Sequence, residues 1–302
     1  MNGTIAVTDY GWYEFLQKKK LPEVNFWKPS DRRQFHAPAF SPFFFKLKAP
    51  HNAICGFAYF AQWSSLPDWL AWECFGEGNG CRSLQELRDR LARIRKRIRY
   101  DSSRSINSIG CILLVQPAFF DPEDWIPQPA DWRSRTVSGK SYDLTTGEGL
   151  RIWEQCQDRA AIAAITTADS RYGSAQTVHP RLGQGTFRVA VTDAYGRACS
   201  VTNEHSLPAL EAAHLRAFAS DGPNEIANGV LLRADLHRLY DNGYVTITQD
   251  LRLQVSPRLR EDFSNGHSYY PLSNRTINLP NNPALHPDRD HLAWHHENVY
   301  LG

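Results

Sequence analysis

Residues 211–241 constrain the fold more than any other part of this sequence, because they combine three short elements with four polar residues at fixed places. An apolar strand ends at His214, a polar loop follows, and an Asn228-Gly229 turn leads into a second apolar run before a helix. His237 and Asp241 are four residues apart in that helix, so their side chains share one face with Cβ atoms about 5–6 Å apart. Imidazole plus carboxylate suits a divalent cation such as Mg²⁺, Mn²⁺, Ni²⁺ or Zn²⁺. The stretch therefore predicts a strand, a loop and a metal-binding helix.

Each of these residues also has an ordinary interpretation when it is taken alone. His214 follows two alanines and fits a hydrogen-bonded core histidine. Asn228-Gly229 is a common turn sequence. His237 and Asp241 could form a solvated ion pair on a helix surface. Their order and spacing together favour a functional site.

The order His, Asn, His, followed by the helix sequence Leu-His-Arg-Leu-Tyr-Asp, resembles the HNH endonuclease family, whose site is a ββα-metal finger. The resemblance implies that His214 is the general base for water attacking a phosphodiester. It further implies that Asn228 holds the loop that aims the base, and that His237 and Asp241 lie at the metal. Many family members carry Asp or His directly before the base, whereas this chain has Ala213. Either the metal keeps more waters or Glu211, two residues earlier on the strand, supplies a ligand.

The whole chain has the length and composition of a soluble α+β protein with two domains. It has 302 residues, of which 42% are hydrophobic and 22% charged, and no apolar run approaches a membrane span. No signal peptide is evident, and the six cysteines form no CxxC pair, so we expect a cytoplasmic protein without a zinc ribbon. A net charge of +2 means that nucleic-acid contacts must come from local basic patches.

The N-terminal region reads as short strands around one or two helices. Apolar runs at residues 43–47 and 53–60 predict a strand pair, and Gly56 lies where another backbone can approach. Ser83 and Glu86 form a capping box that opens an arginine-rich helix. In that helix Arg93 and Arg97 are candidate phosphate contacts, although a solvated helix face is the more common explanation of such residues.

This N-terminal pattern is similar to the PUA superfamily, which includes the EVE, ASCH and SRA domains, and implies a mixed, β-barrel-like domain that holds an extruded base. Such readers precede HNH nucleases in modification-dependent restriction enzymes. Because flipped bases are held by aromatic stacking, the candidate pocket residues are Phe57, Trp63, Trp69 and Trp72. Any one of these aromatic residues could instead belong to the hydrophobic core.

The domain boundaries follow from composition. Residues 133–145 are polar and contain Gly and Ser, which predicts a linker. We therefore expect a recognition domain at residues 1–140, a connecting linker and helix at 141–180, and a nuclease domain at 181–302. The connecting helix could brace the two domains or mediate a homodimer contact, and both alternatives stay open. Three further candidate phosphate contacts lie at the start of the nuclease domain, namely Arg181, Arg188 and Arg197.

These observations predict a restriction-type DNA endonuclease that hydrolyses phosphodiester bonds with a single metal ion, acting on double-stranded DNA that carries modified cytosine. Two alternatives stay open. The N-terminal domain could read an unmodified sequence or sense a phage, or the whole chain could be a DNA-binding regulator with an inactive finger.

Overall fold

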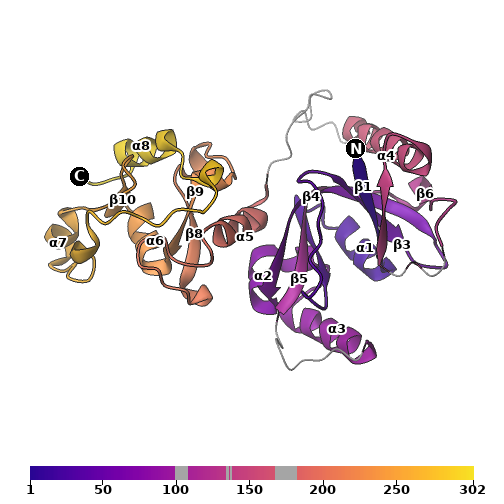
Figure 1. The fold of residues 1–302 in the computed structure, drawn as a ribbon, viewed down its shortest axis with the longest axis horizontal. Coiled ribbons are helices and arrows are strands. Elements are labelled where there is room, and N and C mark those ends of the chain that lie inside the picture. Colours follow the sequence, from indigo (N-terminus) through magenta and orange to yellow (C-terminus); the bar gives the residue numbers. More distant parts are fainter. Residues whose placement is uncertain (99–107, 134–135, 137, 167–181) are drawn as a thin grey trace. The chain divides into compact units, whose positions relative to one another are not determined.

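The computed structural model describes residues 1–98, 108–133, 136, 138–166 and 182–302 (Figure 1). The chain divides into two compact units, unit 1 at residues 1–186 and unit 2 at residues 187–302. Both mix helices and strands, as expected for an α+β protein. No helix among the described residues is long and apolar enough to cross a membrane.

Unit 1 is built on a seven-stranded sheet with the order β2-β5-β4-β3-β1-β7, and β6 pairs with β4. Its strands are β1 (Asn2–Thr8), β2 (Glu23–Lys28), β3 (Pro42–Leu47), β4 (Ala53–Pro67), β5 (Ser108–Phe119), β6 (Ile126–Pro127) and β7 (Gly139–Asp143). Only β1 and β3 run parallel; the other paired strands are antiparallel. Among the described residues no pairing joins β2 to β7, so closure into the expected barrel is not seen.

The strand pair expected at residues 43–47 and 53–60 is confirmed as β3 and β4. Side chains alternate across β3, so that Phe43 and Phe45 join the core on one face and Phe44 joins the core on the other. The expected close approach at Gly56 is also present. A Cβ atom there would lie 2.3 Å from the carbonyl oxygen of Ala118 in β5, so only glycine fits.

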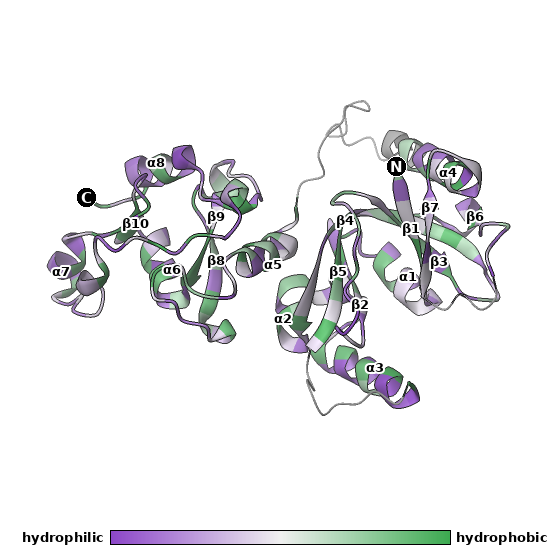
Figure 2. Cartoon of the chain, viewed as in Figure 1, coloured by the Kyte–Doolittle hydropathy of each residue, from purple (hydrophilic) through white to green (hydrophobic). Residues whose placement is uncertain are grey.

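The helices of unit 1 are α1 (Tyr10–Gln17), α2 (Asp68–Phe75), α3 (Leu84–Arg97) and α4 (Gly147–Thr166), with short 3₁₀ turns at Gly76–Asn79 and Pro122–Asp124. Ser83 caps α3 as expected, since its hydroxyl accepts the Glu86 N–H at 3.1 Å, but the Glu86 carboxylate accepts the N–H of Arg82 rather than that of Ser83. Figure 2 shows both hydrophilic and hydrophobic segments on α3, whose Leu87 and Leu91 are buried.

The linker expected at residues 133–145 is wrong for residues 139–143. These residues form β7, which pairs with β1 from Asn2↔Asp143 to Ala6↔Gly139. The polar composition misled the prediction because β7 is an edge strand, with only Tyr142 fully buried. The helix α4 then packs Ile152 and Cys156 into the same core as Tyr142, so unit 1 continues beyond residue 140.

Unit 2 contains the expected finger and a hairpin around one core. Its elements are α5 (Gln184–Ala194, which begins in unit 1), β8 (Leu210–His214), β9 (Gly229–Arg233), α6 (Ala234–Asp241), β10 (Val245–Ile247), β11 (Leu253–Val255), α7 (Arg258–Phe263) and α8 (Arg289–Asn298). Short 3₁₀ turns lie at Leu207–Ala209, Phe218–Ser220, Ile226–Asn228, Tyr270–Leu272 and Pro283–Leu285. β8 pairs with β9, and β10 pairs with β11, both antiparallel.

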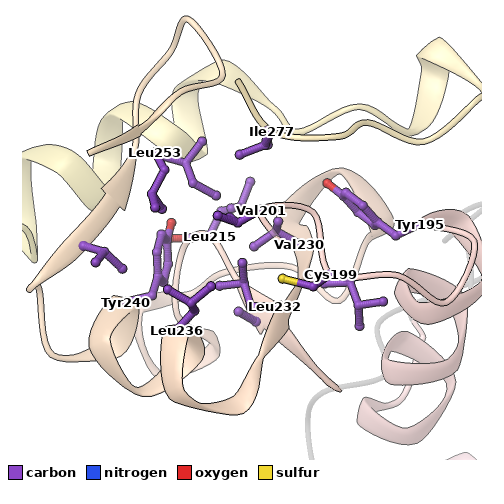
Figure 3. Packing of buried hydrophobic residues seen from close by; sticks show 14 of the residues in the cluster. Tyr195, Cys199, Val201, Leu215, Val230, Leu232, Leu236, Tyr240, Leu253 and Ile277 are labelled. Carbon is purple, nitrogen blue, oxygen red and sulfur yellow. The ribbon is translucent and has the colours of Figure 1, made fainter. Parts of the chain in front are cut away.

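The core of unit 2 fixes α6 against the two finger strands. Leu236 and Tyr240, at i and i+4 on α6, point into a cluster with Val230 and Leu232 of β9 (Figure 3). Because this face of α6 is buried, His237 and Asp241 lie on the helix flank that remains accessible. The pattern of residues 230–241 thus positions both polar side chains.

Candidate active site

His214 is the last residue of β8 and lies opposite Gly229, the first residue of β9. Its imidazole stacks on the ring of Phe187 in α5, with centroids 4.0 Å apart and planes inclined by 11°. The stacking is possible because Gly229 has no side chain: a Cβ atom there would lie 2.4 Å from Val191 and 3.0 Å from Phe187. Gly229 has a φ of −128°, so glycine is needed for this close packing rather than for a turn.

The environment of His214 favours a neutral imidazole. Burial lowers the pKa of His214 below its ordinary value, and the Asn224 hydrogen bond opposes that shift only in part. Nε2 of His214 lies 2.9 Å from Oδ1 of Asn224. With that carbonyl oxygen as acceptor, Nε2 carries the proton and Nδ1 keeps its lone pair, a tautomer assigned from the hydrogen-bond network. Nδ1 is therefore the atom that can take a proton.

Asn228 holds the loop between the two finger strands. Its side chain is fully buried and makes three hydrogen bonds, accepting the Arg216 N–H and donating to the carbonyl oxygens of Arg216 and Pro223. The lengths are 2.8, 3.0 and 2.9 Å. These bonds fix the backbone at Arg216, two residues after His214, and at Pro223, directly before Asn224. This is the loop-pinning position that the HNH resemblance implies for Asn228.

His237 lies between two carboxylates. Its Nδ1 is 2.7 Å from Oε2 of Glu211 in β8, and its Nε2 is 3.3 Å from Oδ2 of Asp241 one turn later in α6. Burial raises the pKa of Asp241, and the neighbouring His237 opposes the shift. The contact shows that Glu211, two residues before Ala213 on β8, reaches His237 on α6.

The donor types around His237 fit a divalent cation, because imidazole nitrogen and carboxylate oxygen are both common ligands. Among the described residues, however, no group of three or more His, Cys, Asp or Glu side chains is arranged to hold an ion. The Glu211 carboxylate lies within hydrogen-bond distance of His237. Nδ1 then donates to Glu211, which leaves the Nε2 lone pair on the side of Asp241.

The candidate phosphate contacts have different surroundings. Arg181 lies outside the described residues. Arg188 is half-buried on α5, and Arg197 is ion-paired with Asp193 at 3.1 Å. Arg93 and Arg97 are exposed at the end of α3. Arg93 and Arg97 thus belong to unit 1, and Arg188 and Arg197 belong to unit 2.

The four aromatic pocket candidates do not form one pocket. Phe57 is buried in the core, where its ring contacts Phe44 and Trp153, so the core alternative holds for this residue. Trp69 and Trp72 are partly buried on α2. Trp63 alone among the four lines an open hollow, which lies between residues 34–39 and residues 60–63.

Two residues at His214 were missed by sequence reasoning. Phe187 is 27 positions before His214 and comes from a different element, so no spacing rule connects them. Asn224 lies in the polar loop, where Asn is common and carries no signal of its own. Only the folded loop brings its amide to the imidazole.

Comparison with known proteins places a family on unit 2. Residues 199–248 match the HNH endonuclease family. No curated protein matches the chain. Among solved structures, the ASCH protein from Zymomonas mobilis matches with 14% identity over 50% of this chain and 94% of that chain, at a TM-score of 0.33. A point mutant of that ASCH protein matches with 14% identity over 50% and 96%, at a TM-score of 0.32. The modification-dependent TagI restriction endonuclease matches with 13% identity over 92% and 75%, at a TM-score of 0.27.

The segment at residues 199–248 contains β8, β9 and α6, and with them His214, Asn228, His237 and Asp241. The resemblance to HNH endonucleases is confirmed for this segment, and unit 2 carries an HNH endonuclease domain.

Proposed function

We propose that the chain is a metal-dependent DNA endonuclease that hydrolyses phosphodiester bonds of double-stranded DNA, and that it acts selectively on DNA carrying a modified cytosine. One observation carries the nuclease part. His214, whose pKa is lowered by burial, interacts electrostatically with His237 and Asp241, and all three lie in the segment that matches the HNH endonuclease family.

Each residue of the site has a separate role in the proposed hydrolysis. Nδ1 of His214 takes a proton from a water molecule, and the resulting hydroxide attacks the scissile phosphorus. Asn224 holds the imidazole in the tautomer that leaves Nδ1 free. Asn228 keeps the loop in the conformation that carries both His214 and Asn224. Phe187 covers one face of the imidazole and, by desolvating it, keeps it neutral.

His237 and Asp241 would hold the divalent cation, with Glu211 orienting His237 through its Nδ1–H. A cation bound there supplies Lewis-acid stabilisation of the negative charge that develops on the phosphate and on the departing oxygen. In this arrangement Glu211 does not replace the ligand missing at Ala213. It fixes the ring that provides the ligand atom.

The proposed selectivity belongs to unit 1. Support comes from its aromatic-rich strands, from the hollow beside Trp63, and from the exposed arginines at the end of α3. A domain that recognises an unmodified DNA sequence would also use an aromatic and basic surface. The choice between these two alternatives is therefore made by experiment. A DNA-binding regulator without activity would not require the intact set at residues 214, 228, 237 and 241.

The test is a digest of one plasmid prepared with and without cytosine modification, in Mg²⁺, Mn²⁺, Ni²⁺ or Zn²⁺. We expect the modified plasmid to be cut, EDTA to stop the reaction, and His214→Ala to be inactive. Equal cutting of both plasmids would support the reader of an unmodified sequence. A wild-type protein that binds DNA but cuts neither plasmid in any metal would support the regulator.

A further inference from the structure

An open hollow of ≈ 590 Å³ lies on unit 2, bounded by the end of α6, by α7 and by residues 265–269. Its volume falls within the roughly 300–1,000 Å³ that is usual for ligand sites. Helix α6 contributes Arg238 and Asn242, and α7 contributes Leu259 and Phe263. None of these residues belongs to the proposed catalytic set, so the mechanism above leaves the hollow without a role.

The hollow begins beside the proposed metal ligands on the same helix. His237 and Asp241 are four residues apart and form one row on the accessible flank of α6. Arg238 and Asn242 form the next row, about 100° further round the helix, and both are exposed. A DNA strand with its scissile phosphate at the first row therefore has the hollow next to it on the second.

One side of the hollow is aromatic. Phe263, the last residue of α7, is 59% exposed, which is unusual for a large apolar side chain. Its ring packs edge-on against Tyr244, with centroids 5.4 Å apart, and the buried Leu259 lines the hollow one turn earlier. Exposed aromatic rings are surfaces on which nucleobases stack. This side of the hollow therefore suits a flat, aromatic group.

The α6 side of the hollow carries a positive charge that no carboxylate neutralises. The guanidinium of Arg238 has no hydrogen bond or ion pair with any described residue. The acidic residues nearby are already paired, since Asp262 lies 3.3 Å from Arg258 and Asp235 lies 2.7 Å from Arg233. A free guanidinium can bind a phosphate through two parallel hydrogen bonds. The α6 side therefore suits an anionic group.

The third side of the hollow is a turn with a fixed backbone. Gly266 has a φ of +117°, and a Cβ atom there would lie 2.6 Å from the ring of Tyr270, so only glycine fits. Its N–H donates to the side-chain oxygen of Asn265, and its carbonyl oxygen accepts the N–H of Tyr270. His267 and Ser268 are exposed on this turn and line the hollow. They supply polar groups for the edge of a ligand.

We propose that this hollow is a nucleotide site, with the base against Phe263 and a phosphate on Arg238. Two sources can supply a nucleotide, namely the DNA strand that is cut and a free nucleotide. The first rests on the proposed function and deepens it, because it assigns a subsite beside the scissile phosphate. The site is made only of residues of unit 2, so it does not depend on what unit 1 recognises.

The test uses the full chain with His214→Ala, so that DNA is bound but not cut, and two probes. One is a fluorescently labelled DNA duplex, followed by anisotropy between about 50 and 200 mM salt. The other is dAMP that carries an N-methylanthraniloyl group, followed by its own fluorescence. Circular dichroism confirms the folding of each variant.

Each proposed contact has a matched control. Arg238→Gln removes the phosphate contact, and Arg275→Gln removes an exposed arginine of unit 2 that does not line the hollow. Phe263→Leu removes the aromatic ring and keeps an apolar side chain, whereas Phe263→Tyr keeps the ring.

If the DNA strand is the source, Arg238→Gln should lower the slope of log Kd against log salt by about 1 and weaken duplex binding roughly 5–10-fold. Phe263→Leu should weaken it roughly 5–100-fold, because a stacked base loses its partner. Arg275→Gln and Phe263→Tyr should stay within about twofold of the parent. If a free nucleotide is the source, the same ranking should appear with labelled dAMP, while affinity for the duplex stays unchanged.

Absent binding, or unchanged binding of both probes by Arg238→Gln and Phe263→Leu, would overturn the proposal and leave the endonuclease assignment intact. A loss shown by only one of the two variants would also overturn it, since a nucleotide requires both contacts. If the chain with His214 intact cuts no duplex, the proposed function fails. Labelled dAMP then still decides whether the hollow binds a nucleotide, so the two failures are distinguished.

Discussion

His214 is the residue on which the proposed chemistry depends, and its surroundings act on the imidazole in two ways. Phe187 removes solvent from one face of the ring, which disfavours the charged form. Asn224 occupies Nε2, so a proton can be accepted only at Nδ1. A general base must be unprotonated before the reaction, and both contacts serve that requirement.

The first prediction concerns the pH dependence of cleavage. Since burial lowers the pKa of His214, the fraction of neutral base stays high until the pH falls below the ordinary histidine value of about 6.5. The rate should therefore be lost on the acidic side, with a midpoint below that value. His214→Ala should lower kcat by roughly 10²–10⁴-fold and leave the affinity for DNA unchanged. The control is His205→Ala, at an exposed histidine, which should keep its activity. Near-native cleavage by His214→Ala would contradict the assignment of His214 as the general base.

The second prediction concerns His295, which is buried in unit 2 and stacks on Tyr240 with ring centroids 3.6 Å apart. Its Nε2–H donates to the carbonyl oxygen of Tyr240, and its Nδ1 accepts from the Thr246 hydroxyl. Burial lowers the pKa of His295 to about 4. In the unfolded chain the pKa returns to about 6.5. The unfolded state therefore binds the extra proton between these values.

The stabilisation by neutral His295 is complete above pH of about 6.5 and is lost as the pH falls towards 4. A shift of this size corresponds to about 3 kcal/mol, at roughly 1.4 kcal/mol per pKa unit. Urea unfolding of unit 2 followed from pH 7 to pH 4.5 should show this loss, and His295→Gln should flatten the dependence. His296→Gln, on the exposed side of the same helix, should keep it. Identical pH profiles for the two variants would contradict the prediction.

Among individual residues, the sequence analysis identified the polar residues that lie in one motif. It missed Phe187 and Asn224, which no motif connects to His214. Asn228, His237 and Asp241 were predictable because turns and helices have fixed local geometry. Phe187 was not, since its contact with His214 depends on tertiary packing across Gly229. Phe57 was misassigned to a pocket because a single aromatic residue in a strand looks the same in a core and in a binding site.

The element that organises unit 2 is the finger made of β8, the 215–228 loop, β9 and α6. The buried Asn228 links the two ends of the loop through three hydrogen bonds to the backbone. This amide acts together with backbone hydrogen bonds of the loop, such as that from the Leu215 N–H to the Asn228 carbonyl oxygen, in placing Asn224 relative to His214. Loop conformation and catalysis should therefore change together.

The third prediction follows for Asn228→Ala, which removes all three hydrogen bonds and leaves buried backbone groups unpaired. Unfolding should become easier by about 1–3 kcal/mol, and kcat should fall because Asn224 is no longer held at the imidazole. Asn228→Asp keeps the acceptor but loses both donations and buries a charge, so it should not restore activity. Asn298→Ala, at the exposed end of α8, is the control. Full activity of Asn228→Ala would show that the loop is held by other contacts.

The fourth prediction separates the roles of Glu211 and Asp241 around the helix α6. Asp241→Asn removes a proposed ligand, whereas Glu211→Gln keeps an oxygen that can still accept the Nδ1–H of His237. We expect Mn²⁺ affinity measured by calorimetry to fall most for Asp241→Asn and His237→Ala. Glu211→Ala should lose about 10–100-fold, as for other partners of ligating histidines, and Glu211→Gln less. A larger loss for Glu211→Gln than for Asp241→Asn would make Glu211 the direct ligand.

Among elements, the amphipathic and capped ones were predicted well and the edge strand was not. The Ser83 cap of α3 and the β3–β4 pair follow from local patterns that the structure keeps. β7 was not predicted because only one of its five side chains, that of Tyr142, is buried, so it lacks an apolar pattern. As an edge strand it is held by its backbone pairing with β1. The sheet order, with β1 parallel to β3, depends on pairings distant in sequence that no local pattern encodes.

At the scale of the whole molecule, the charge is arranged locally rather than globally. The net charge is only +2, yet the end of α3 presents three exposed basic side chains and the 28–36 loop adds Arg33. Recognition would therefore be confined to one face of unit 1, and catalysis to the finger of unit 2. Because β7 pairs with β1, unit 1 extends beyond residue 140 and includes α4.

The last prediction tests this division of labour with two separate pieces, residues 1–166 and residues 182–302. The first piece should bind DNA and prefer duplexes with a modified cytosine. The second should cut weakly and without that preference, since His214, His237 and Asp241 all lie within it. A pocket that discriminates a single methyl group supports only about 10–200-fold selectivity, so the intact chain should cut unmodified DNA slowly rather than not at all. Gel-shift titrations with matched duplexes measure the preference. Equal affinity of residues 1–166 for plain DNA and for several cytosine modifications would leave a nuclease that reads an unmodified sequence as the better account.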